Sequence, residues 1–379
     1  MKILLVTDVL GQENNGTTIA AMNFIRALRK NGHEVRILCA DQDKKDEPDY
    51  FIVDNLSLGK ILDKYVHKVG VTLAKPVKKI IENAMDGVDY VHIMLPFALG
   101  KAALKIAKKK GLPVTAGFHC QAENFTAYLK LNRLRLLNHL VYKNMYRKFY
   151  KYVDGIHYPT QFIKDVFESH IKKQTNGYII SNGVNRQVHR KEIAKPEEYK
   201  DKIVILSTGR YAREKSQDVL INAINRSKYR DKIQLILAGQ GVKEQKYKRL
   251  AKKLPIPPVF KFFSRDEVIN VLNYADMYVH SADIELEGIA CLEAIACGKL
   301  VIVSSSELSA TKNFAVDNKC IFKNRNAKHL ANVIDYFIEN RDEKYCIEQK
   351  NLFNAKIYDQ DVCMDHMEKM IKEIYEKVA

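Results

Sequence analysis

Two glutamates stand eight residues apart in the segment SADIELEGIACLEAIACG, with Gly288 between them. A glycine lets an anion approach the backbone, and a helix predicted to begin near Ile289 and Ala290 would offer it unpaired N–H groups and a positive dipole end. Glu293 lies on that helix, where a carboxylate can accept hydrogen bonds from ribose hydroxyls. Glu285 precedes it and can touch a transferred group. The alternative is that both acids only stabilise the helix dipole.

A second cluster of charged residues, STGRYAREKSQ, follows a predicted buried strand. Arg210 offers a planar fork of donors and Lys215 a point charge, and together they can converge on a diphosphate. Arg213 and Glu214 are predicted to be solvated neighbours. Two cations on a loop are a weak signal by themselves. The glutamates that follow in the same half of the chain make the signal specific.

Two further candidates lie in the first half of the chain. Gly16, in the segment NNGTT, follows the first predicted strand and permits close approach of a ligand, although an ordinary Asn-Gly turn explains it equally well. The fingerprint GxGxxG is absent there, which argues against a dinucleotide site and so against an epimerase or a nicotinamide dehydrogenase. His119 follows another strand and can bond a sugar hydroxyl. A lone histidine is more often structural, and neither zinc spacing nor a catalytic triad is visible.

Short apolar strands alternate with amphipathic helices through the whole chain, which predicts parallel, doubly wound α/β sheets. The first series has predicted strands at 1–7, 34–40, 88–94 and 113–119. The second series has predicted strands at 202–208, 233–238, 277–281 and 300–304. The turn signal Ser181-Asn182-Gly183 separates the series, so we expect two Rossmann-like lobes, 1–182 and 183–359, with a helix over 360–379 packing back onto the first lobe. Ligands bind at the carboxyl ends of such strands, which makes the cleft between the lobes the expected site.

Charge is distributed unevenly along the 379 residues. The 62 Lys and Arg exceed the 45 Asp and Glu by 17, and residues 101–153 carry 12 basic residues against the single acid Glu123. A surface with this charge is expected to bind an anion: a phosphorylated substrate, a nucleic acid or an anionic lipid.

No apolar run approaches the roughly 18 residues of a spanning helix, and the N-terminus does not read as a signal peptide. Seven scattered cysteines without CxxC pairs argue against a disulfide framework or a zinc site. We therefore expect a cytoplasmic protein.

Taken together, these motifs resemble glycosyltransferase family 4, whose retaining members have the GT-B fold of two Rossmann lobes. The family's E-x7-E motif matches Glu285 and Glu293, and its diphosphate-binding pair matches Arg210 and Lys215. Its N-terminal glycine loop and its histidine after a first-lobe strand match Gly16 and His119. A narrower similarity to bacterial lipid α-glucosyltransferases, namely cholesterol α-glucosyltransferases and monoglucosyldiacylglycerol synthases, rests on NNGTT, MLPF, FHCQAEN, SNGV, GRYAREK and VHSADIELEGIACLEAI.

The resemblance implies transfer of glucose from UDP-glucose, with retention, to the hydroxyl of diacylglycerol or a sterol. Glu285, His119, Arg210 and Lys215 would be the catalytic residues. Gly16, Gly288, Glu293 and the helix start at Ile289 and Ala290 would complete the sugar-nucleotide site. No metal is implied, because two cations and a helix dipole replace it. The sequence departs from the family at Leu286 and Glu287, where Gly and Phe are usual. A polysaccharide or lipid-linked oligosaccharide acceptor remains an alternative.

The segment 126–152 has seven Lys or Arg, no acid, and many Leu and Tyr. It is predicted to form a basic amphipathic helix that lies on an anionic membrane and makes the protein peripheral. The expected membrane or acceptor contacts are Lys130, Arg133, Arg135, Lys143, Arg147 and Lys148. Two alternatives stay open: a helix packed on its own lobe with a solvated basic face, and a nucleic-acid-binding surface.

Overall fold

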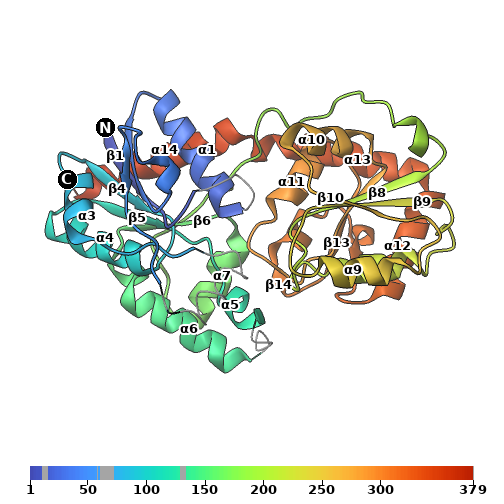
Figure 1. The fold of residues 1–379 in the computed structure, drawn as a ribbon, viewed down its shortest axis with the longest axis horizontal. Coiled ribbons are helices and arrows are strands. Elements are labelled where there is room, and N and C mark those ends of the chain that lie inside the picture. The colour runs from blue at the N-terminus through green and yellow to red at the C-terminus, as the bar shows by residue number, and fades with distance from the viewer. Residues whose placement is uncertain (11–15, 58, 60–71, 129–133, 379) are drawn as a thin grey trace. The chain divides into compact units, whose positions relative to one another are not determined.

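The computed structural model describes the chain except for residues 11–15, 58, 60–71, 129–133 and 379. The described chain forms two compact units (Figure 1). Unit 1 comprises Met1–Gly183 with Gln360–Ala379, and unit 2 comprises Val184–Asp359. Each unit is an α/β domain on a parallel sheet, so the predicted fold class is confirmed.

The sheet of unit 1 has seven described strands in the order β3-β2-β1-β4-β5-β6-β7. The strands are β1 (Lys2–Val6), β2 (Glu34–Cys39), β3 (Tyr50–Ile52), β4 (Tyr90–Ile93), β5 (Val114–Gly117), β6 (Gly155–Tyr158) and β7 (Gly177–Ile179). Every residue of β4, β5 and β6 is buried, as in a parallel sheet covered on both faces. The order reverses beside β1, which is the topological switch at which doubly wound sheets bind ligands.

Helices cover both faces of this sheet. They are α1 (Gly16–Lys30), α3 (Lys78–Ala84), α4 (Ala98–Lys109), α5 (Ala122–Tyr128), α6 (Arg135–Lys148), α7 (Gln161–Ile171) and α14 (Gln360–Val378). The C-terminal helix α14 packs beside α1 (Figure 1). Met367, Met370 and Ile371 of α14 share one buried cluster with Phe24 and Leu28 of α1, so the last residues of the chain complete the core of unit 1.

The single helix expected over 126–152 is wrong. Helix α5 ends at Tyr128 and α6 begins at Arg135, with the undescribed residues 129–133 between them. Buried polar contacts join the two helices: Thr126 Oγ1 donates to Asn138 Oδ1 at 2.8 Å, and Tyr142 Oη donates to Glu123 Oε2 at 2.5 Å. A continuous helix would hold these pairs several turns apart, so the contacts require the chain to fold back.

The main sheet of unit 2 has the order β10-β9-β8-β11-β13-β15 among the described residues. Its strands are β8 (Ile203–Thr208), β9 (Ile233–Ala238), β10 (Val259–Lys261), β11 (Met277–His280), β13 (Val301–Ser304) and β15 (Ile321–Phe322). A separate pair is formed by β12 (Ile284–Glu285) and β14 (Leu308–Ser309). The helices are α8 (Gln217–Ile224), α9 (Glu244–Ala251), α10 (Arg265–Tyr274), α11 (Ile289–Ala296), α12 (Ala327–Glu339) and α13 (Arg341–Ala355).

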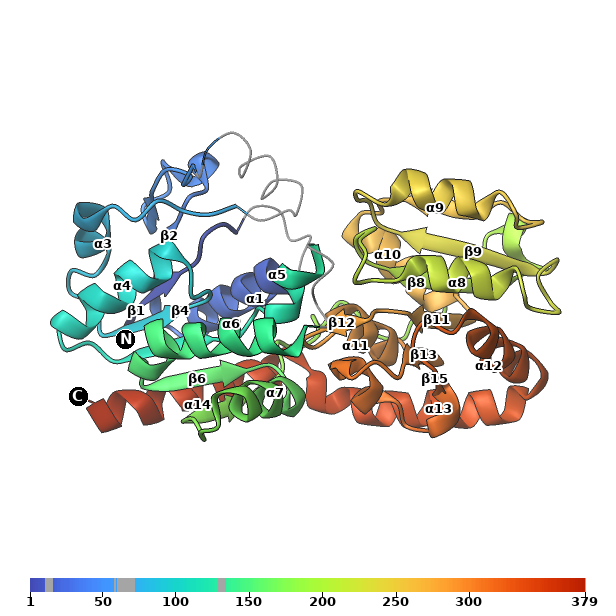
Figure 2. The same ribbon diagram turned by 90° about the horizontal axis from the view of Figure 1, so that it is seen from below.

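Alternate residues of each central strand of unit 2 enter different cores. Ile205 and Val279 pack with α8, α9 and α12, whereas Leu206 and Tyr278 pack with α10 and α11. Figure 2 shows these helices around the strands. Because side chains alternate between the faces of a strand, both faces must be apolar, which explains the continuous hydrophobic runs of the sequence.

Candidate active site

The central feature of the candidate site is an ion pair between Lys215 and Glu285. Lys215 Nζ contacts Glu285 Oε2, and His280 Nε2 lies 3.1 Å from the same oxygen. Burial raises the pKa of the Glu285 carboxyl, but Lys215 and His280 together outweigh burial and lower this pKa to about 2. Glu285 is therefore a carboxylate at neutral pH, held beside a cation in unit 2.

Gly288 places the start of α11 next to Glu285. Its φ of +88° is left-handed, and a Cβ atom there would stand 2.6 Å from Thr311 Cγ2 and 3.2 Å from Glu285 Cγ. A side chain at this position would be both strained and obstructed, so the turn requires glycine. The first N–H groups of α11, starting at Ile289, have no partner within the helix. Their positive end thus lies beside the Lys215–Glu285 pair, and the geometry suits an anion.

Arg210 follows the turn that ends β8. Its Nη2 lies 3.2 Å from Glu214 Oε1, and the Glu214 side chain is buried. The expectation that Glu214 is solvated is therefore wrong: its carboxylate orients the guanidinium from within the loop. The backbone also ties this loop to the glutamate segment, because Asp283 N donates to Glu214 O at 2.7 Å and Ser281 Oγ donates to Lys215 O at 3.0 Å. The sequence marks both loops by their charged residues but carries no signal of the contacts that join them.

Glu293 lies on α11 and is buried, with Arg265 Nη1 2.6 Å from its Oε1. Burial raises the pKa of Glu293, against the opposing effect of Arg265. Arg265 is the first residue of α10, where Ser264 and Glu267 form a capping box. That box marks a helix start in the sequence. Nothing in the spacing links Arg265 to Glu293, and the role of Glu293 toward ribose stays a prediction.

His119 of unit 1 lies inside its domain. Its side chain is buried, Nε2 has no hydrogen-bond partner among the described residues, and the ring lies 5.4 Å from that of His157. Burial lowers the pKa of His119 well below the usual range, and His157 and His92 lower it further. Its predicted role toward a sugar hydroxyl stays a prediction. The ring turns back over Gly117, the last residue of β5.

Gly16, the other candidate in unit 1, is the first residue of α1 and is exposed. The two asparagines that precede it in the NNGTT segment lie outside the described residues. An exposed glycine at the start of a helix is accessible to a ligand. Its predicted role stays a prediction.

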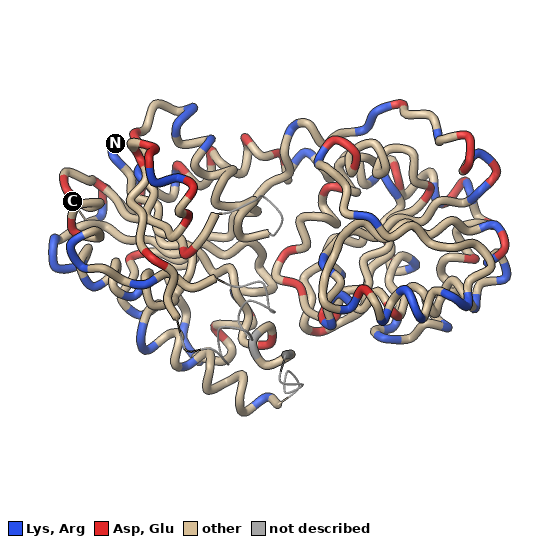
Figure 3. The backbone as a smooth tube through the Cα atoms, in the orientation of Figure 1, with Lys and Arg blue, Asp and Glu red and all other residues tan. Residues whose placement is uncertain are grey.

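Helix α6 and the residue before it present leucines to solvent. Leu136 and Leu140 of the helix are 73% and 55% exposed, and Leu134, which precedes it, is 52% exposed. Helical spacing places Lys143 and Arg147 on the same face as the two leucines of the helix. Figure 3 shows basic residues along this edge of unit 1. The other predicted contacts are distributed as follows: Arg135 and Lys148 lie at the two ends of α6, while Lys130 and Arg133 lie outside the described residues.

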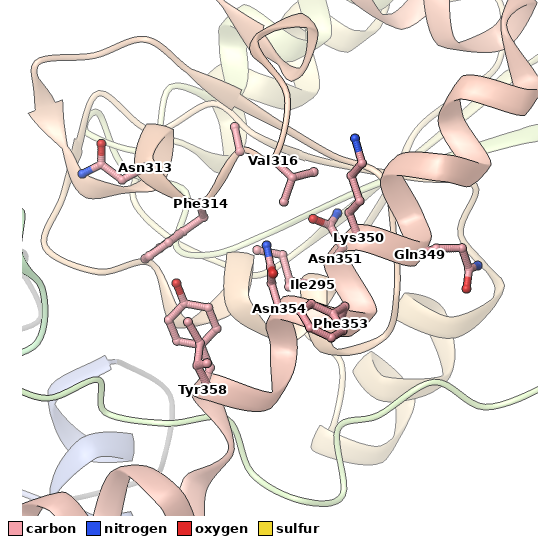
Figure 4. A pocket seen from close by; sticks show the side chains of 12 residues that line it. Ile295, Asn313, Phe314, Val316, Gln349, Lys350, Asn351, Phe353, Asn354 and Tyr358 are labelled. Atoms are coloured by element: carbon pink, nitrogen blue, oxygen red, sulfur yellow. The ribbon is translucent and has the colours of Figure 1, made fainter.

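Unit 2 also contains a pocket of about 660 Å³ (Figure 4). It is lined by residues of η4 (Ala310–Phe314) and α13, among them Phe314, Lys350 and Phe353, and it holds none of the predicted site residues.

In the described ranges, no helix is long and apolar enough to cross a bilayer. Nor do three or more His, Cys, Asp or Glu side chains of the described chain gather as ligands for a metal.

Two parallel-sheet α/β units of this kind, together with the family matches, place the chain in the GT-B class of glycosyltransferases. Residues 14–188 match the family described as Glycosyltransferase Family 4, and residues 188–352 match Glycosyl transferases group 1. The two matches together span nearly the whole chain, and the protein belongs to glycosyltransferase family 4.

The relatives include lipid-modifying enzymes. An α-monoglucosyldiacylglycerol synthase of Streptococcus pneumoniae is 25% identical over 319 residues, which are 80% of this chain and 70% of the relative. The catalytic domain of a cholesterol-α-glucosyltransferase from Helicobacter pylori is 41% identical, covering 41% of this chain and 98% of that domain, with a TM-score of 0.40. HepE of Anabaena, solved with UDP-glucose, has the same fold, with a TM-score of 0.75 at 16% identity over 98% of this chain and all of HepE.

Proposed function

We propose that this glycosyltransferase moves glucose from UDP-glucose to a hydroxyl of diacylglycerol, with retention at the anomeric carbon. The observation that carries the proposal is the arrangement of Lys215, Glu285 and the start of α11 in unit 2. Its chemistry fits a sugar diphosphate, because a cation and N–H groups that have no partner within their helix lie close together. The acceptor is proposed from the similarity to the diacylglycerol-modifying relative, and a sterol is the second choice.

In the proposed reaction, the acceptor oxygen bonds to the anomeric carbon from the face that the diphosphate leaves. The bond between that carbon and the diphosphate oxygen breaks, and the acceptor proton passes to the departing diphosphate. Arg210, Lys215 and the N–H groups of Ile289 and Ala290 stabilise the charge that develops on the leaving oxygen. Each preorganised donor of this kind contributes about 3 kcal/mol. The proposal assigns no metal, since these groups supply the positive charge.

Helix α6 is proposed to bring the enzyme to its lipid acceptor. A leucine pair flanked by cations suits the interface of an anionic bilayer, where apolar side chains insert and basic ones meet headgroups. Leu136 and Leu140 are uncovered in unit 1, although burial in its core would otherwise stabilise the fold. This supports a peripheral location at a membrane, which we propose to be its cytoplasmic face, and favours a membrane over a nucleic acid as the anionic partner.

The test offers the protein a panel of radiolabelled UDP-glucose, UDP-galactose, UDP-N-acetylglucosamine and GDP-mannose, with vesicles containing diacylglycerol or cholesterol. We expect label in a lipid only with UDP-glucose, and an α-anomer in the product by NMR. E285A is expected to abolish transfer, whereas K248A, on the exposed face of α9, is expected to leave it unchanged. Label in a water-soluble glycan, and not in a lipid, would show that the acceptor is a glycan. Absence of labelled product, together with no binding of UDP by calorimetry, would overturn the proposal.

A further inference from the structure

A chain of buried polar side chains runs behind Glu285. Thr208 Oγ1 lies 2.9 Å from Tyr278 Oη, which lies 3.3 Å from His280 Nδ1, and His280 Nε2 lies 3.1 Å from Glu285 Oε2. Tyr278 is fully buried and His280 nearly so. The chain joins the last residue of β8 to the last residue of β11 and ends on the carboxylate.

The chemistry of the four groups gives the chain one direction. A carboxylate only accepts hydrogen bonds, so His280 Nε2 must donate to Glu285. In a neutral imidazole the other nitrogen, Nδ1, is then an acceptor, and the Tyr278 hydroxyl donates to it. The Tyr278 oxygen in turn accepts from the Thr208 hydroxyl. With a neutral imidazole every donor thus points toward Glu285: the carboxylate selects the Nε2–H tautomer of His280, and the two hydroxyls orient to match it.

The two oxygens of Glu285 are used unequally. Lys215 Nζ and His280 Nε2 both contact Oε2, and no hydrogen bond from the described residues ends on Oε1. Lys215 alone supplies the charge that the carboxylate needs, but a lysine on a flexible stem does not fix the rotation of the carboxyl plane. The His280 imidazole does fix this rotation, because its Nδ1 atom is held by Tyr278.

We propose that His280 is a positioning residue of the transfer reaction, which holds Oε2 of Glu285 toward Lys215 and leaves Oε1 to accept from a hydroxyl of the donor sugar. This inference rests on the proposed function, because it assigns Glu285 to the sugar. It adds a coupling within unit 2: Thr208 directly precedes Gly209 and Arg210, so the same chain links the strand end that carries the arginine to the glutamate.

Three variants test the assignment kinetically. H280A removes the donor, and we expect kcat to fall about ten- to hundredfold while KM for the sugar nucleotide changes less than about threefold. H280Q keeps an N–H donor and an acceptor on one planar amide, and it is expected to recover most of the lost kcat. Y278F leaves Nδ1 unpaired and should lie between H280Q and H280A. H329A changes an exposed histidine of the same unit and is expected to match the wild type.

A spectroscopic measurement separates this inference from the proposed function. ¹⁵N spectra of histidine-labelled protein without nucleotide, with the His280 signal assigned by its loss in H280Q, should show Nε2 protonated and Nδ1 unprotonated. Y278F should keep this tautomer, because the Glu285 carboxylate still requires a donor at Nε2, and should shift the Nδ1 signal, which loses its hydrogen bond. An Nδ1–H tautomer in the wild type, or stable H280A and H280Q variants with equal kcat, would overturn the assignment. Failure of the wild type to form any glycolipid, with the expected tautomer present, would overturn the proposed function only.

Discussion

The imidazole of His119 lies over the Cα atom of Gly117, so that a Cβ atom at position 117 would stand 2.2 Å from His119 Nε2. Gly117 is not in the left-handed region, and its backbone would accept alanine without strain. Glycine is therefore required at position 117 to leave room for the His119 ring, and not to allow the backbone conformation. The pair fixes where the ring rests at the end of β5.

Gly117→Ala is expected to displace the His119 ring, because a separation of 2.2 Å is far inside van der Waals contact. If His119 bonds a sugar hydroxyl, as the family resemblance implies, kcat should fall about tenfold or more, since small displacements of positioned groups are costly. UDP affinity, measured by calorimetry, should stay unchanged because the proposed diphosphate site lies in unit 2.

A double-mutant cycle provides the control for this prediction. In an H119A background, G117A should cause no further loss of kcat, because the group that it displaces is already absent. Additive losses would show that Gly117 acts through something other than His119.

Lys215→Met is expected to destabilise unit 2 by about 3 kcal/mol, because it leaves the mostly buried Glu285 carboxylate without its cation. Urea denaturation measures this loss. Lys248→Met breaks an exposed pair with Glu244 and should cost less than about 1 kcal/mol. The double variant K215M/E285Q should recover much of the stability without recovering transfer. Transfer by K215M at the wild-type rate would show that Lys215 takes no part in the reaction.

Replacing Leu136 and Leu140 by serine is expected to weaken binding to vesicles that contain anionic lipid, because two exposed apolar side chains can no longer insert. Replacing Lys143 and Arg147 by glutamine should also weaken binding, by about 1 kcal/mol for each charge, and should flatten its salt dependence. Cosedimentation at several salt concentrations distinguishes the two effects.

Phe353→Ser is the matched control for the leucines, because Phe353 in unit 2 is 73% exposed, as Leu136 is. Its vesicle binding should equal that of the wild type. An equal loss in this variant would show that general surface hydrophobicity, and not α6, governs adsorption.

Stability should fall on mild acidification because unit 1 buries neutral histidines. Burial lowers the pKa of His92 to about 3 and that of His157 to about 4, whereas an unfolded histidine titrates near 6.5. Between pH 6.5 and 4 the unfolded chain binds protons that the folded chain excludes, so the free energy of unfolding decreases as the pH falls. Each histidine accounts for about 1.4 kcal/mol between pH 7.5 and 5.5. H157Q should reduce the loss by that amount in urea titrations at both pH values, and an unchanged loss would contradict the burial of a neutral ring.

The alternation of apolar strands and amphipathic helices was sufficient to predict two doubly wound sheets. This pattern is local, since a strand buried on both faces must be apolar throughout and a helix must repeat near every 3.6 residues. The glycine before Ile289 likewise marked the start of α11 within the sequence itself. The charged loops after β8 and β11 were visible for the same reason.

Tertiary structure decided which of these residues meet. Lys215 and Glu285 are 70 positions apart, and sheet order alone brings β8 beside β11 so that their loops touch. Arg265 reaches Glu293, α5 folds back onto α6, and His119 turns inward over Gly117, none of which follows from spacing. Residue types and periods are properties of a short segment. Partnership between distant side chains depends on how whole elements stack, and only the folded chain determines that.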